Sequence, residues 1–157
     1  MSGFVIEPGA QLQGANLRSA NLQGANLQGA DLTDADLFSA NLQGAFIRGA
    51  SFVNADLRDA NLQRVQGRAM FNGARLEHAN FQGAQLEHCD FTTANLTDAN
   101  FTDANLTWTK FYDSHLERTN LNRADISYWE HDGADFIDAI SPNGKLLTGY
   151  SRRDEGS

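Results

Sequence analysis

A stretch with a period of five residues decides the fold. Residues 20–44 read ANLQG ANLQG ADLTD ADLFS ANLQG, so alanine, asparagine or aspartate, a large apolar residue and two further residues recur in order. Neither an α-helix nor a β-strand has a period of five. A fixed repeat of this kind is typical of a solenoid, in which every unit adds the same piece of structure.

The repeat extends in both directions from this stretch. We call the large apolar residue of each unit its centre. Centres run from Leu12 to Leu62 at intervals of five, and an alanine stands two residues before each. The next clear centre, Phe71, follows Leu62 by nine residues, and the regular spacing then holds as far as Phe136. The predicted segments are an N-terminal cap (1–9), a first β-helical segment (10–64), a short unit with a register slip (65–68), a second β-helical segment (69–138), and a C-terminal cap and tail (139–157).

Each unit predicts one side and one corner of a coil. Residues two apart in an extended chain share a face, so the alanine and the centre point inward while the Asn or Asp between them points outward. The two remaining residues are often Gly, Asp, Asn, Ser or Thr, which favour turns. A chain that turns the same corner repeatedly winds into a coil.

The number of sides per coil follows from the second segment, where Phe and Leu centres alternate from Phe71 to Leu116. Three units per coil would stack every Phe on a Leu, whereas four units stack Phe on Phe and Leu on Leu. We favour four, because each layer then keeps the same cross-section and residue n lies above residue n+20. The predicted core centres are Phe71, Phe81, Phe91, Phe101, Phe111, Leu76, Leu96 and Leu116.

The pattern over residues 10–138 resembles the pentapeptide-repeat family. The resemblance implies an all-β fold, a right-handed quadrilateral parallel β-helix, here with about six coils of four pentapeptides and short caps. The sequence departs from the pattern at the short unit, at Thr109, Ser114 and Thr119 in the alanine slot, and at Trp129 with His131 near the end.

Both ends of an open β-helix expose unpaired backbone, which natural proteins cover. We expect residues 1–9, with Phe4, Val5, Ile6 and Pro8, to form one lid. At the other end Trp129 is too large for the alanine slot, and Ser-Pro-Asn-Gly at 141–144 predicts a turn between two apolar pieces. The predicted C-terminal cap residues are Trp129, Ile140, Leu146 and Leu147. This end is interpreted as a plain cap, with an end-to-end homodimer contact as the alternative to a monomer.

Composition excludes several classes of partner. The formal net charge of -8 argues against nucleic acid and suits a basic protein partner or solubility. No apolar run approaches the roughly 18 residues of a membrane span, and the N-terminus lacks the features of a signal peptide. The single cysteine, Cys89, falls in an alanine slot and is expected to be an inert core residue in a reducing compartment. We therefore expect a cytoplasmic protein that binds neither membrane nor nucleic acid.

No catalytic, cofactor-binding or metal-binding residues are predicted. The four histidines, at 78, 88, 115 and 131, lack the close spacing with Cys or acidic residues that marks a zinc site. Twenty-residue stacking places His78 over Asp98 and Arg118, which predicts a solvated charge ladder. Phosphate-binding loops and nucleophile motifs are also missing from the sequence. The sequence therefore predicts a protein that is not an enzyme.

Stacking also identifies outer columns of residues. Asn21, Asn41, Asn61, Asn80, Asn100 and Asn120 share a side, where stacked amides favour a structural hydrogen-bond ladder. One corner of the second segment carries three rings where the first segment often has glycine. The candidate interaction surface consists of His88, Trp108 and Tyr128, with Glu87, Thr107 and Ser127 beside them. Exposed aromatic residues are enriched at interface centres, but neighbouring rings can also stack for stability alone. Both interpretations stay open at this stage.

Three functions are compatible with the sequence. The leading hypothesis is a non-enzymatic protein-interaction module that presents a rigid acidic surface to a protein partner, of the kind abundant in cyanobacteria. The resemblance also implies an alternative, a DNA mimic that binds DNA gyrase. About six and a half coils at the roughly 4.8 Å spacing of paired strands would form a rod of about 30 Å. A DNA duplex of that length carries about 18 phosphate charges, far more than the net charge of -8 of this chain. A structural scaffold with no partner is the third hypothesis.

Overall fold

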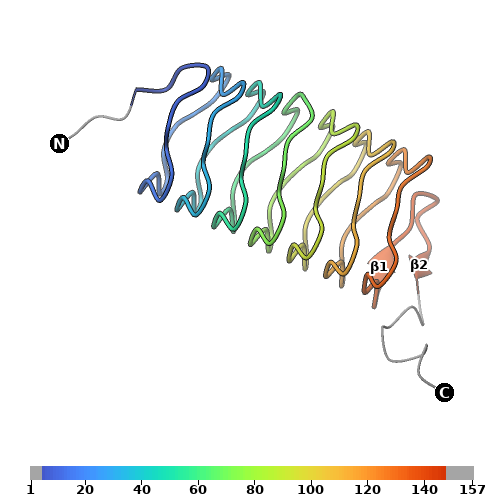
Figure 1. Cartoon of the computed structure of the whole chain (residues 1–157). Coiled ribbons are helices and arrows are strands. Elements are labelled where there is room, and N and C mark those ends of the chain that lie inside the picture. The colour runs from blue at the N-terminus through green and yellow to red at the C-terminus, as the bar shows by residue number, and fades with distance from the viewer. Residues whose placement is uncertain (1–4, 148–157) are drawn as a thin grey trace.

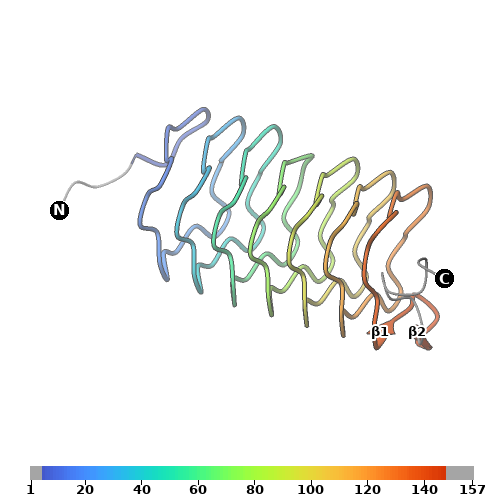
Figure 2. The same cartoon turned by 60° about the horizontal axis from the view of Figure 1, so that its bottom comes forward.

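The protein is a rod of stacked coils. The computed structural model describes residues 5–147. Their backbone winds repeatedly around one axis, and residues 5 and 147 lie toward opposite ends of the rod (Figure 1). Turned by 60°, successive coils repeat the same outline (Figure 2). The prediction of a right-handed quadrilateral β-helix is confirmed.

Most of the sheet structure consists of single-residue bridges. Within residues 5–147 the regular strands are β1 (Ala139–Ile140) and β2 (Leu146–Leu147), which form an antiparallel hairpin. On the sides of the coils, the outward Asn or Asp position forms an isolated parallel bridge to the next coil. Longer strands do not form on these sides, because a corner follows every unit.

The coils stack with a period of twenty residues. Gln11 bridges Asp31, and Asp31 bridges Ser51. The period falls to nineteen across the short unit, where Ser51 bridges Met70, and it returns to twenty from Met70 to Asp90. The prediction of four units per coil is therefore confirmed.

Outside the short unit, each corner is a turn closed by one hydrogen bond. The alanine N–H donates to the carbonyl oxygen of the centre three residues earlier, as Ala15 does to Leu12 at 3.0 Å. The second residue after the centre has a positive φ, which is 62° at Gly14 and 59° at Trp108. A positive φ at this turn position and not at the preceding one is the pattern of a type II turn. Glycine suits the position because it has no Cβ.

The interior is filled by centres and alanines. All the predicted core centres of the second segment are fully buried. Phe71 stacks on Phe91 with ring centroids 4.7 Å apart, and Phe91 stacks on Phe111 at 5.2 Å. Rings of neighbouring columns meet edge to face, as Phe71 and Phe81 do at 6.0 Å. Both arrangements are favourable for aromatic pairs, so the phenylalanines form continuous stacks along the rod.

The outward asparagines form hydrogen bonds within the coils and between them. In the column from Asn21 to Asn120, each side-chain oxygen accepts a hydrogen bond from the backbone N–H two residues later. The amides also connect coils, since Asn61 Nδ2 donates to Asn41 Oδ1 and Asn100 Nδ2 to Asn80 Oδ1, each at 3.2 Å. This column is therefore structural.

The short unit lacks one corner residue. Gly67 takes the position of a centre, because its N–H donates to Gln85 O at 3.0 Å, as a centre's N–H does. Arg68 follows it, and the residue that should come next with a positive φ is missing. Instead of closing a turn, the Ala69 N–H donates to Cys89 Sγ at 3.3 Å, and Sγ lies 3.5 Å from Gly67 O. A sulfur from the next coil thus replaces the usual turn hydrogen bond.

The coil begins inside the predicted N-terminal cap. The Ala10 N–H donates to Glu7 O at 3.1 Å, which closes a corner of the usual kind. Val5 is largely exposed, and Ile6 packs against the core. Residues 1–4, with Phe4 of the expected lid, lie outside the described residues. The described part of the predicted cap therefore belongs largely to the first coil.

The coil also continues past the boundary predicted at residue 138. Ile140, expected in the cap, bridges Asn120 and occupies the outward position of a further side. Ser141 stands in the position of the centre there, so the repeat pattern gives no apolar signal for this unit. The expected turn follows, and the Gly144 N–H donates to Ser141 O at 2.9 Å. Residues 148–157 of the predicted tail lie outside the described residues.

Trp129 lies at the C-terminal end of the core. Its ring meets Phe111 edge to face at 5.7 Å and lies 5.4 Å from Phe136. Trp129, Phe136 and Leu147 line a shallow apolar hollow, whereas Leu146 is exposed. Trp129 and Leu147 thus lie beside the last buried ring of this end.

Candidate interaction surface

One corner of the coil carries glycine before the short unit and residues with ring side chains after it. Before the slip it carries Gly29 and Gly49, and after it the same position holds His88, Trp108 and Tyr128 in successive coils. Their φ angles are 60°, 59° and 57°. Bulky residues are uncommon in this left-handed region. Trp108 is 47% exposed and Tyr128 68% exposed, so both side chains project from the rod.

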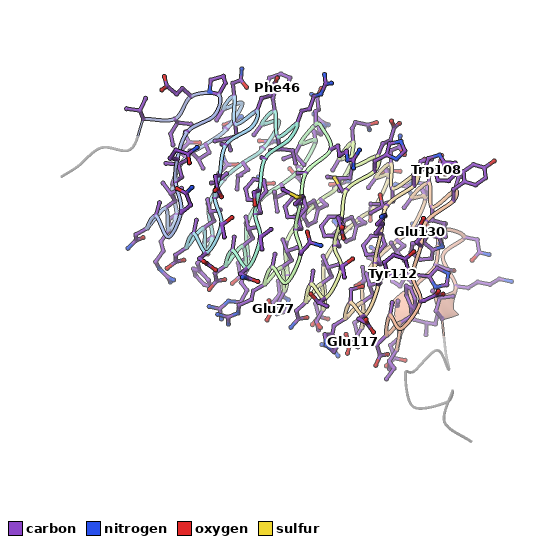
Figure 3. The ribbon with its side chains drawn as sticks, in the orientation of Figure 1. Phe46, Glu77, Trp108, Tyr112, Glu117 and Glu130 are labelled. Atoms are coloured by element: carbon purple, nitrogen blue, oxygen red, sulfur yellow. The ribbon has the colours of Figure 1, made fainter. Side chains whose placement is uncertain are left out.

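These three residues, which we call the aromatic corner, form one stack. The His88 and Trp108 rings are 6.2 Å apart with planes 12° from parallel, and Trp108 and Tyr128 are 4.5 Å apart at 11°. Trp108 lies on the upper edge of the rod in Figure 3. Stacking covers part of each ring face, so a partner would meet ring edges and the outer face of the stack. Ring edges carry partial positive charge, and the indole N–H and phenol O–H are hydrogen-bond donors.

The polar neighbours of the aromatic corner bond within the coils. Thr107 Oγ1 donates to Asn105 Oδ1 at 2.7 Å, and Ser127 Oγ donates to Asp125 Oδ1 at 2.6 Å. Asn105 Nδ2 donates to Glu87 Oε1 at 2.6 Å. These bonds restrain all three polar side chains beside the exposed rings of Trp108 and Tyr128.

Two apolar residues that were not predicted from the sequence lie on the sides that meet at this corner. Phe46 and Met70 stand in the outward slot normally held by Asn or Asp, and they are 41% and 46% exposed. Phe46 and Trp108 lie along the same edge of the rod in Figure 3. The signal was present in the sequence, because a large apolar residue in the outward slot breaks the repeat as clearly as one in the alanine slot.

Ion pairs between coils neutralise part of the acidity of the second segment. Arg118 donates to both carboxylate oxygens of Asp98, at 2.7 and 2.6 Å, and Arg123 does the same to Asp103 at 2.6 and 2.8 Å. These guanidinium hydrogen bonds hold the pKa of each aspartate below its ordinary value. His78 occupies the same corner position as Asp98, one coil earlier, as the twenty-residue stacking predicted. In Figure 3, Glu77 and Glu117 lie on the edge opposite Trp108.

Cys89 and Tyr112 also form hydrogen bonds within the rod. Burial raises the pKa of the Cys89 thiol to about 12, so the thiol stays protonated at neutral pH. The Tyr112 hydroxyl donates to the Glu130 carboxylate, and this bond raises the pKa of Tyr112. Within residues 5–147 no group of three or more His, Cys, Asp and Glu residues could hold a metal ion. No helix in this part of the chain is long and apolar enough to cross a membrane.

Two family models cover most of the chain. The model of the pentapeptide repeats, in eight copies, matches residues 10–45 and 35–66, and that of the pentapeptide repeat region matches residues 67–130. The chain belongs to the pentapeptide-repeat family. The two matched regions of this pentapeptide-repeat protein meet within the short unit. Comparison with the curated proteins finds no significant match.

Solved structures of other pentapeptide-repeat proteins are similar to this one. HetL from the cyanobacterium Nostoc sp. strain PCC 7120, involved in heterocyst differentiation regulation, is 23% identical over 88% of this chain and 79% of its own, with a TM-score of 0.38. Trypsin-treated QnrB1, a plasmid-mediated fluoroquinolone resistance protein, is 19% identical over 79% of this chain and 66% of its own, with a TM-score of 0.50. Rfr23 from the cyanobacterium Cyanothece 51142 is 24% identical over 69% and 62%, with a TM-score of 0.39. At 19% identity, the likeness to QnrB1 shows the fold alone.

Proposed function

We propose that this protein is a non-enzymatic interaction module that binds a protein partner through the aromatic corner. The observation that carries the proposal is the exposure of Trp108 and Tyr128, at 47% and 68%, in a backbone conformation that the first segment gives to glycine at the same corner. Holding a bulky residue in this region costs about 1–3 kcal/mol. Large exposed rings at such positions support a role beyond closing the turn, because Gly or Asn would close it with less strain.

Stability alone is the competing explanation for the rings. A stacked aromatic pair contributes about 0.5–1.5 kcal/mol, which offsets only part of the conformational cost. The rings also leave their edges in water instead of burying them in the core. Measurements of stability and of binding on the same variants therefore separate the two explanations.

The test replaces the rings without altering the turn. Asparagine tolerates a positive φ, so the double variant Trp108→Asn/Tyr128→Asn keeps the corner and removes the stack. Immobilised wild type and variant are compared for proteins captured from an extract of the source organism, and the captured protein is then purified and its Kd measured. His78→Asn, at a φ of 61° on another corner, is the matched control.

We expect the double variant to lose the partner and the His78→Asn control to keep it. Equal capture by the double variant and the wild type would refute this choice of face. If that variant only lowers the thermal midpoint, the rings serve stability. If the wild type captures nothing that the matrix alone does not, the hypothesis of a scaffold without a partner replaces the proposal.

A DNA mimic directed at DNA gyrase is the alternative. The net charge of -8 is of the required sign, but ion pairs such as Asp98–Arg118 and Asp103–Arg123 interrupt the acidic surface. A supercoiling assay with purified gyrase tests the alternative directly. Inhibition at micromolar protein would favour it over an unrelated partner. The expected cytoplasmic location stays a prediction.

A further inference from the structure

The missing residue of the short unit leaves a hollow beside the aromatic corner. The hollow measures about 490 Å³ and is lined by Arg48, Gly67, Arg68, Gln85, Glu87 and His88. Gly49 and His88 hold the second corner position in the coils before and after the short unit. The residue that would lie between them, directly after Arg68, is the one that is missing. A second, smaller hollow is lined by Arg48 and Arg68 together with Met70. We call Arg48, Gly67 and Arg68 the notch.

The two arginines of the notch have no carboxylate partner among the described residues. Arg48 and Arg68 occupy the same position in adjacent coils, since Phe46 bridges Gln66. The described arginines that do form ion pairs are Arg18, Arg58, Arg75, Arg118 and Arg123. Like charges at the spacing of adjacent coils repel each other. An anion between the guanidinium groups would relieve this repulsion and accept hydrogen bonds from both.

The backbone N–H groups of Arg48 and Arg68 also lack hydrogen-bond acceptors among residues 5–147. In most units an outward Asn or Asp oxygen accepts from the N–H two residues later, as Asn26 does from Gln28 at 3.2 Å. Phe46 and Gln66 hold this slot before Arg48 and Arg68. Within residues 5–147, neither arginine N–H has a hydrogen-bond acceptor. The notch therefore contains two kinds of unsatisfied hydrogen-bond donor, the guanidinium groups and the backbone N–H groups of the two arginines.

We infer that the notch binds a carboxylate side chain from an acidic segment of a partner protein. The inference rests on the proposed interaction function and names the chemistry of the partner. Exposed Phe46 and Met70 beside the notch provide apolar contact for the residues next to that carboxylate. Nucleic acid is disfavoured, because its row of phosphates would extend beyond the notch and meet the acidic remainder of a chain of net charge -8, whereas a single carboxylate needs only the two arginines.

The test measures binding of defined probes to the full chain. The probe is a fluorescein-labelled octapeptide of alternating Glu and Leu, followed by fluorescence anisotropy at low ionic strength. A Lys and Leu octapeptide and a single-stranded oligonucleotide serve as comparison probes. The variants are Arg48→Gln, Arg68→Gln and the double variant. Arg64→Gln is the matched control, because Arg64 is exposed and has no ion-pair partner among residues 5–147 but lies at a different corner.

We expect the Glu and Leu peptide to bind, and each notch variant to weaken binding about tenfold, as the loss of one charge-assisted hydrogen bond predicts. Arg64→Gln should change the affinity less than about twofold, and added salt should weaken wild-type binding. Absence of peptide binding at about 1 mM, or equal weakening by Arg64→Gln, would overturn the inference. Oligonucleotide binding that depends on the same arginines would overturn it in favour of a nucleic acid ligand.

The outcome can be separated from that of the proposed function. The variants of Trp108 and Tyr128 leave the notch intact, and the arginine variants leave the aromatic corner intact. Loss of partner capture with the ring variants but no peptide binding would refute the notch alone. Peptide binding at the notch together with unchanged capture by the ring variants would refute the aromatic corner alone.

Discussion

Replacement of Gly67 by alanine should destabilise the protein far more than an ordinary glycine substitution at a corner. Gly67 has a φ of 123°, and a Cβ added there would lie 2.6 Å from Arg48 N and 2.8 Å from Arg48 Cα. Both atoms belong to the backbone of the preceding coil, so they cannot move aside as a flexible side chain would. The strained backbone costs about 1–3 kcal/mol and the overpacking a similar amount, which gives about 4 kcal/mol as a central value. For a chain of this size, that corresponds to a fall of about 8–16 °C in Tm.

The assay is thermal and urea unfolding followed by far-UV circular dichroism, together with fluorescence of Trp108 and Trp129. Gly83→Ala is the matched control, because Gly83 also has a positive φ, of 68°, but its added Cβ would meet only Arg64 Cγ at 3.5 Å. The control should cost about 1 kcal/mol, from the left-handed conformation alone. If both variants unfold at the same midpoint, the close approach of the two coils at the short unit does not have the cost assigned to it.

Three further predictions concern the core, the thiol and the ion pairs. Phe91→Ala should cost about 3–5 kcal/mol in urea unfolding, because Phe91 is fully buried between two stacked rings; a cost under about 1 kcal/mol would contradict the continuous stack. Cys89 should resist iodoacetamide in the native protein and react once unfolded, since its pKa is about 12 and it is fully buried; modification at equal rates in both states would show that the thiol is accessible. The lowered pKa of Asp98 means that its pairing with Arg118 adds stability above the unfolded-state pKa of about 3.9, and that this stability is lost as the pH falls through the lower folded-state value. Unfolding midpoints should therefore decrease below about pH 4, and less steeply in Asp98→Asn; identical pH profiles would rule out this contribution.

The repeat made the architecture predictable because its information is local. A period of five with small and large apolar residues two apart specifies which side chains point inward, whatever lies elsewhere in the chain. The alternation of Phe and Leu centres then distinguished four units per coil from three. The nine-residue interval between Leu62 and Phe71 located the short unit, and the bridges change period across that unit.

The ends of the coil could not be read from the same pattern. Glu7 and Ser141 occupy centre positions without being large and apolar, so neither unit has the expected signature. Backbone hydrogen bonds define these units instead, and such bonds are available to any side chain. The predicted boundaries at residues 9 and 138 therefore fall inside the coil.

Sequence by itself determined the solenoid, its four sides and the outer column that carries His88, Trp108 and Tyr128, because these follow from a repeat that every unit obeys. Tertiary structure alone decided what happens where one unit breaks the repeat. Contacts between residues about twenty apart determine how Cys89 closes the short unit, why Gly67 holds a centre position, and why Arg48 and Arg68 are neighbours along the rod. At the short unit the conformation is therefore set by contacts with the neighbouring coil and not by local sequence preference.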